Sequence, residues 1–265
     1  MQQKLRRFYI SFVINIIMII LASSSFIIEV VNFYLHRETS IYITIWGLFR
    51  YFTIDGNILS LILNIIVFFA QLKAIRMPEG EDIKSIIMNN FLFKISLMAA
   101  STELVIFITV VLIFLPFAPH EWVMGLVGSY NASSFHITIP ILLAFRFIFL
   151  DAREKDLKWY EKLLGGLPML IYGTIMLILC GAKVFLSFDP DKGDGKIPYP
   201  FLDIYHQSWH YCTFCAIFIF AFGFGIGFLL EYLNKKCEKL ILPYDFSSDS
   251  NSQEKSNELL VNENE

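Results

Sequence analysis

Six apolar stretches, each long enough to cross a bilayer, constrain this chain more than any other feature. A membrane-spanning helix needs about 20 mostly apolar residues at a rise of about 1.5 Å each. Of the 265 residues, 56% are hydrophobic and only 17% are charged, whereas soluble domains carry about 25% charged residues. The sequence therefore predicts an all-α polytopic membrane protein with six transmembrane helices. The stretches run over residues 8–28, 51–72, 91–117, 130–150, 163–182 and 209–230.

The distribution of lysine and arginine predicts which side of the membrane each loop occupies. Six spans place both termini on one side, and most basic residues fall on that side. They are Lys4, Arg6, Arg7, Lys73, Arg76, Lys84, Arg153, Lys155, Lys158, Lys162, Lys235, Lys236 and Lys239, whereas the other side carries Arg37, Arg50, Lys192 and Lys196. Because basic loops face the cytoplasm, both termini are expected to be cytoplasmic.

Two regions are expected along the chain. Residues 1–242 form the six-helix transmembrane domain, and residues 243–265 form an acidic cytoplasmic tail that is rich in Ser, Asn and Glu and is expected to be disordered. No basic patch interleaved with aromatics suggests a nucleic-acid partner. His206 and His210 have no third metal ligand, so neither a metal nor a cofactor is expected. The plasma membrane is the expected location, with an endomembrane as the alternative, and the oligomeric state stays open.

One histidine lies inside an apolar span. His136 is the only acidic, basic or imidazole side chain between Glu121 and Arg146, and such a group in the bilayer is a functional candidate. By the predicted topology it lies about 9 Å below the outer face, and Thr53 on another span lies about 5 Å below it. A hydroxyl and an imidazole at similar depth are the minimum for a base-activated nucleophile. His210, at the outer start of the last span, is an alternative base.

Three short motifs occur in order and in matching topological places: FRYFTIDGNIL at 49–59, HITIP at 136–140 and YPFLD at 199–203. Together they resemble the androgen-induced-protein family of multi-pass membrane hydrolases, nearest its uncharacterised bacterial-type relatives. The resemblance covers about residues 41–236. It implies a threonine hydrolase that cleaves fatty-acid esters of hydroxy fatty acids, with Thr53 as the nucleophile and His136 as the essential histidine. The chain departs from the family in its longer cytoplasmic connector, acidic outer loop and added tail.

Other polar residues extend the candidate pocket. Asn57, one helical turn from Thr53, is either an oxyanion donor or a helix-packing residue. Asp55 and Asp203 are on the correct side to orient His136, and the alternative for each is a cap or loop role. Glu103, deep in the third span, handles a proton or substrate, or else pairs with another helix.

Three functions are consistent with these residues. The first is hydrolysis of a lipid ester in an outward-facing intramembrane pocket, with membrane lipids as surroundings and a lipid ester as substrate. The second is a lipid or small-molecule transporter or binding protein in which Glu103 and His136 relay protons. The third is a non-catalytic membrane scaffold. Arg146, near a cytoplasmic helix end, is expected to anchor at the headgroups.

Overall fold

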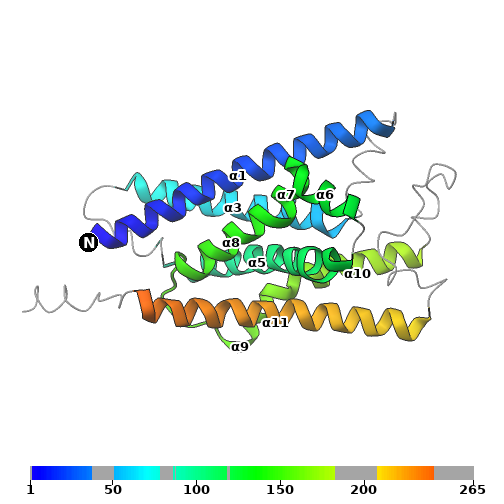
Figure 1. The fold of residues 1–265 in the computed structure, drawn as a ribbon. Helices are drawn as coiled ribbons and strands as arrows, with labels where there is room; N and C mark the ends of the chain where they lie inside the picture. The colour runs from blue at the N-terminus through cyan, green and yellow to red at the C-terminus, as the bar shows by residue number, and fades with distance from the viewer. Residues whose placement is uncertain are drawn as a thin grey trace, which may run out of the picture.

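The computed structural model describes residues 2–37, 51–77, 86, 88–117, 120–182 and 208–241. This part of the chain is helical and contains no strand (Figure 1). Six helical spans are long and apolar enough to cross a membrane, so the chain is an all-α, multi-pass membrane protein, as predicted. The residues on either side of the expected boundary at 242, and the tail at 243–265, lie outside the described part.

The elements follow the predicted apolar stretches closely. Two of them, α1 and α11, extend well beyond the predicted ends, and two short helices, α6 and α9, lie outside the predicted stretches. The elements are α1 (Gln2–Arg37), α3 (Phe52–Ile75), α5 (Asn90–Phe107), η1 (Ile108–Phe114), η2 (Leu115–Phe117), α6 (His120–Gly128), α7 (Tyr130–Ser133), η3 (Ser134–Thr138), α8 (Ile139–Phe149), α9 (Trp159–Lys162), η4 (Leu163–Gly166), α10 (Leu167–Gly181) and α11 (Trp209–Ile241).

The spans form one bundle with α5 at its centre. In Figure 1, α1 runs along one side and α11 along the other, and the start of α1 and the end of α11 lie at the same end of the bundle. Helix α5 packs against α3, α8 and α11, and α3 packs against α1. We call the end with the start of α1 the basic end, because most lysines and arginines lie there. The start of α3 and segment η3 lie at the opposite end.

Paired charges join the connector after α8 to α11 at the basic end. Glu231 is buried, with its carboxylate 3.2 Å from Arg153 and 2.8 Å from Lys162. Asp156 is exposed and pairs with Lys235 and with Arg153. The hydrogen bond from Lys235, together with the charge of Arg153, holds the pKa of Asp156 below its ordinary value. These pairs therefore join α11 to the connector after α8 and to α9.

Glycines allow α11 and η4 to meet backbone to backbone. A Cβ added to Gly227 lies 2.8 Å from the Lys162 carbonyl oxygen and 3.1 Å from Gly165 Cα, whereas one added to Gly225 meets nothing within 4 Å. The small-residue face at Gly223 and Gly227 therefore packs against α9, η4 and α10 within one subunit.

Replacing Gly227 with alanine is expected to destabilise the bundle by about 1–3 kcal/mol, because backbone atoms cannot move aside for the methyl group. The matched change Gly225→Ala, two residues away on the same helix, is expected to stabilise the bundle by about 0.5–1 kcal/mol. Alanine has less conformational freedom than glycine in the unfolded chain, so it loses less entropy on folding. Unfolding of the detergent-solubilised protein measures both values. Equal effects of the two changes would show that the α11–η4 contact is not tightly packed.

Candidate functional site

Thr53 is the second residue of α3 and lies at the opposite end of the bundle, with its side chain half-buried. Threonines inside helices usually donate to the carbonyl four residues earlier, and Thr102 and Thr174 do so at 2.9 and 2.8 Å. The residue four positions before Thr53 lies outside the described part of the chain. Within the described residues the Thr53 hydroxyl makes no hydrogen bond.

Asn57 joins the first turns of α3 to η3. Its Nδ2 donates to the backbone carbonyl of Thr53 at 2.8 Å and reaches that of Phe135 at 3.5 Å. Asn57 is buried, so this link is shielded from solvent and lipid. Because both amide hydrogens point at carbonyls, Asn57 holds two helices together and is not poised to stabilise an oxyanion. The packing alternative for this residue is the one that the hydrogen bonds support.

Pro140 explains why the Phe135 carbonyl is free to accept this bond. In η3 the helix widens to a π turn, so that the Ile139 amide donates to the Ser134 carbonyl five residues earlier. In the same five-residue register, the amide of residue 140 would donate to the Phe135 carbonyl. Residue 140 is a proline, which has no N–H to donate. The Phe135 carbonyl therefore lacks its partner in the helix. Single π turns of this kind are frequent at functional sites.

His136 lies in the π segment η3, next to Phe135, and is half-buried. Its Nδ1 is 2.8 Å from the Ala132 carbonyl oxygen. A carbonyl only accepts, so Nδ1 carries the hydrogen and Nε2 keeps its lone pair. A backbone carbonyl thus orients the ring, and no carboxylate is required for that purpose. Among the described residues no direct hydrogen bond joins the Thr53 hydroxyl to this ring.

The other predicted site residues fall into three groups. Asp55 is half-buried in the first turn of α3, does not cap that helix, and has a buried Oδ1 without a hydrogen-bond partner. His210 is exposed, and its ring lies against that of Trp209 in a tilted arrangement at a centroid distance of 4.1 Å, so the alternative base is not buried within the bundle. Asp203 lies outside the described residues. Glu103 is fully buried in α5, beside Ser60 of α3.

Arg146 is not a headgroup anchor, and that prediction was wrong. Its side chain is 0% exposed and turns inward from α8. Nη1 donates to Asn15 Oδ1 at 2.9 Å and to Asn64 Oδ1 at 2.5 Å, and Nη2 donates to Ser96 Oγ at 3.1 Å. Nε lies 3.5 Å from Asp151 Oδ2. One guanidinium therefore connects α1, α3, α5 and the connector after α8, which makes snorkelling impossible.

A periodic pattern of polar residues in the α3 sequence could have revealed this buried network. Asn57, Ser60, Asn64 and Gln71 recur at spacings of three, four and seven residues, which places them on one helical face. All four are buried. A polar stripe inside an otherwise apolar span indicates polar partners on neighbouring helices.

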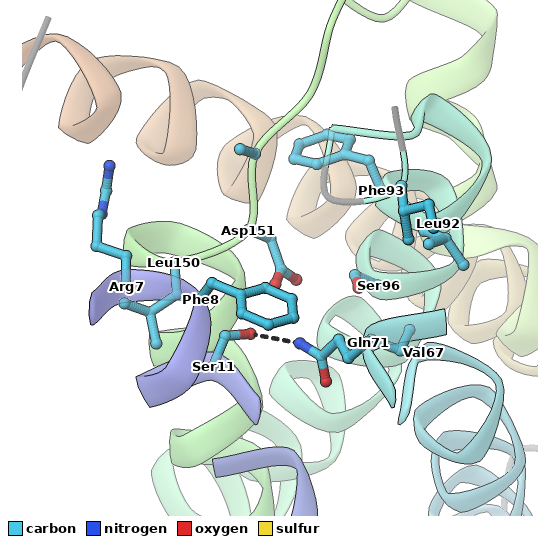
Figure 2. A pocket seen from close by; sticks show the side chains of 12 residues that line it. Arg7, Phe8, Ser11, Val67, Gln71, Leu92, Phe93, Ser96, Leu150 and Asp151 are labelled. Carbon is cyan, nitrogen blue, oxygen red and sulfur yellow. Dashed lines mark hydrogen bonds between the residues drawn. The ribbon is translucent and has the colours of Figure 1, made fainter. Parts of the chain in front are cut away.

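A small cavity of about 50 Å³ adjoins the Arg146 network at the basic end (Figure 2). Gln71, Ser96 and Asp151 are on its wall, and Gln71 Nε2 donates to Ser11 Oγ at 3.1 Å. Arg7, at its edge, donates to the Phe149 carbonyl at 2.5 Å. The cavity is large enough to hold water. It lies at the far end of the bundle from Thr53, so it is separate from the candidate catalytic residues.

No protein-family profile, curated protein or solved structure matches this chain. The resemblance carried by the three sequence motifs therefore stays a prediction. The chemistry of the site is argued below from its own residues.

Proposed function

We propose that the chain is an integral membrane hydrolase of lipid esters, with Thr53 as the nucleophile and His136 as the general base. One observation supports this proposal: at the same end of the bundle, one side chain has an unbonded hydroxyl and the other has a ring nitrogen that can accept its proton. The Thr53 hydroxyl has no hydrogen-bond partner among the described residues. The His136 ring is held through Nδ1 by the Ala132 carbonyl, which leaves Nε2 as an acceptor.

The reaction follows from these states. His136 Nε2 takes the proton of the Thr53 hydroxyl while Thr53 Oγ1 attacks the ester carbonyl carbon. The tetrahedral intermediate collapses to an acyl-threonine, and the imidazolium returns the proton to the departing alcohol. Water then attacks the acyl group with His136 again as base, which releases the carboxylic acid and restores Thr53. Asn57 acts as a positioning residue, because it holds the Thr53 turn against the segment that bears His136.

The proposed substrate is an amphipathic lipid ester of the fatty-acid ester of hydroxy fatty acid type. A site about two turns inside the membrane suits an ester bond that lies within the acyl region rather than in water. Apolar side chains near the site face outward, such as Tyr130 at 48% and Ile141 at 50% exposure. A lipid therefore has an apolar surface along which to approach. The family resemblance supplies the ester class.

Labelling with a fluorophosphonate probe tests the nucleophile. We expect the wild-type protein to be labelled and Thr53→Val, which keeps the shape but removes the hydroxyl, to lose all labelling. Thr53→Ser is expected to keep it. Thr174→Val is the matched control, because that hydroxyl is bound to its own helix at 2.8 Å.

Two outcomes would exclude this mechanism. One is undiminished labelling of Thr53→Val, which would locate the reactive hydroxyl elsewhere. The other is absence of labelling in the folded wild-type protein, as a scaffold protein would give. Peptide mass spectrometry of the labelled protein identifies the modified residue directly.

A further inference from the structure

Two buried glutamates in the described bundle have opposite surroundings. Glu231 is 3% exposed and its carboxylate contacts two cations, Arg153 and Lys162, at 3.2 and 2.8 Å. Glu103 is 0% exposed, and neither of its carboxyl oxygens has a hydrogen-bond partner among the residues that the structure describes. Within the described residues no basic side chain lies within 4.0 Å of it. The first site suits a carboxylate, whereas the second lacks anything that would neutralise one.

A neutral hydroxyl lies beside Glu103. Ser60 of α3 lies beside its carboxyl group. Helices α3 and α5 cross closely there, since a Cβ added to Gly56 lies 3.0 Å from the Thr102 side chain, next to Glu103 in the chain. Asn57, next to Gly56, lies on the same face as Ser60. Within the described part of the chain, the Ser60 hydroxyl and the Asn57 Oδ1 atom are both buried without a hydrogen-bond partner. Ser60, beside Glu103, can accept a carboxylic acid proton, and Asn57 lies one turn further along the same face.

Charged groups are scarce on the elements packed against this part of α5. The α10 and η4 sequences and residues 213–230 of α11 contain no acidic, basic or histidine side chain. On α3 the first turn holds Asp55, which is on a different face from Ser60. His136 of η3 lies towards the opposite end. The nearest cation towards the basic end is Arg146, which binds Ser96, about 10 Å from Glu103 along α5.

We propose that Glu103 is a proton-binding site inside the bundle, with Ser60 and Asn57 as hydrogen-bond partners of the carboxylic acid. Its proton exchanges with solvent through the opposite end of the bundle, where Thr53 and His136 lie. A bound proton neutralises the Glu103 carboxylate and at the same time provides a donor for a buried oxygen that has no hydrogen-bond partner. Hard cations such as Ca²⁺ and Mg²⁺ take six or more oxygen ligands, more than this crossing presents. Towards the basic end the fixed charge of Arg146 repels a migrating proton, so exchange proceeds through Asn57.

Infrared spectroscopy of the full-length protein in phospholipid vesicles tests the bound proton without any substrate. The wild-type minus Glu103→Gln difference spectrum at neutral pH is expected to contain the C=O stretch of a protonated carboxylic acid. The matched difference for Glu231→Gln is expected to contain carboxylate bands instead. Absence of the acid band from the Glu103→Gln difference would overturn the proposal. Loss of that band on adding Na⁺ would also overturn it, by identifying a metal-cation site.

The direction of exchange is read from the shift of the same band after transfer to D₂O. Asn57 and Gln71 are buried amides on the same stripe of α3, on either side of Glu103. Asn57→Leu is expected to slow the deuterium shift severalfold, and Gln71→Leu is expected to leave its rate unchanged. Slowing by Gln71→Leu alone would show that the proton moves through the basic end. Because no ester is added, a negative result here is distinct from failure of the hydrolase mechanism.

Discussion

Replacing Arg146 with methionine is expected to destabilise the bundle by about 3–5 kcal/mol, because the change removes one partner of a buried charged network and leaves the others unpaired. The guanidinium donates hydrogen bonds to Asn15, Asn64 and Ser96 and makes an ionic interaction with Asp151, and methionine can make none of these. The buried amides and the carboxylate are then left without a donor that any lipid could replace. Unfolding of the detergent-solubilised protein measures the difference in stability.

Two companion variants make this result specific. Arg146→Lys keeps the charge but lacks the planar fork that reaches three acceptors at once, so we expect an intermediate loss of stability. Lys155→Met removes a charge from an exposed side chain at the same end, and its effect is expected to stay within about 0.5 kcal/mol. If Arg146→Met is as stable as Lys155→Met, the network does not hold the helices together.

The second large effect is expected on the rate of ester hydrolysis. His136→Ala should lower kcat towards a fatty-acid ester of a hydroxy fatty acid by about 10²- to 10⁴-fold, because the Thr53 hydroxyl then lacks a base. Added imidazole should restore part of the lost rate by entering the space that the ring occupied. A ring that serves packing alone, through its bond to Ala132, would give no such rescue.

His210→Ala is the matched control for this experiment, since its ring is exposed and lies against that of Trp209. We expect its hydrolysis rate to equal that of the wild type. If His210→Ala abolishes hydrolysis and His136→Ala does not, the base is His210 and the assignment to His136 is wrong. Circular dichroism of each variant separates loss of chemistry from loss of fold.

Much of the fold is readable from the sequence because membrane thickness sets the length of an apolar stretch. The predicted stretch at 209–230 and helix α11 both begin at Trp209. Helix α3 begins at Phe52, one residue after the start of the predicted stretch at Tyr51. The extra length of α1 and α11 was missed, because polar residues such as Glu29 and Lys235 end an apolar stretch but do not end a helix.

The candidate site could be predicted only in part from the sequence. Depth in the membrane indicated that Thr53 and His136 share one end, but the bridge by Asn57 depends on a carbonyl released by Pro140 in a π register, which periodicity does not reveal. Arg146 was misplaced for a related reason. Its partners come from three other spans, and a single-span view of a basic residue near a helix end favours the headgroups.

The six spans differ in length, and the bilayer must adapt to them. The span that carries His136, Tyr130–Phe149, has 20 residues, whereas Arg7–Asn32 has 26 and Trp209–Cys237 has 29. At about 1.5 Å per residue the first matches a hydrocarbon core of about 30 Å, and the last exceeds it by more than 10 Å. The long outer helices therefore tilt or thicken the surrounding bilayer, whereas the short one crosses it without mismatch. Hydrophobic mismatch is thus uneven around a single protein, and the lipid beside the histidine-bearing helix is the least distorted.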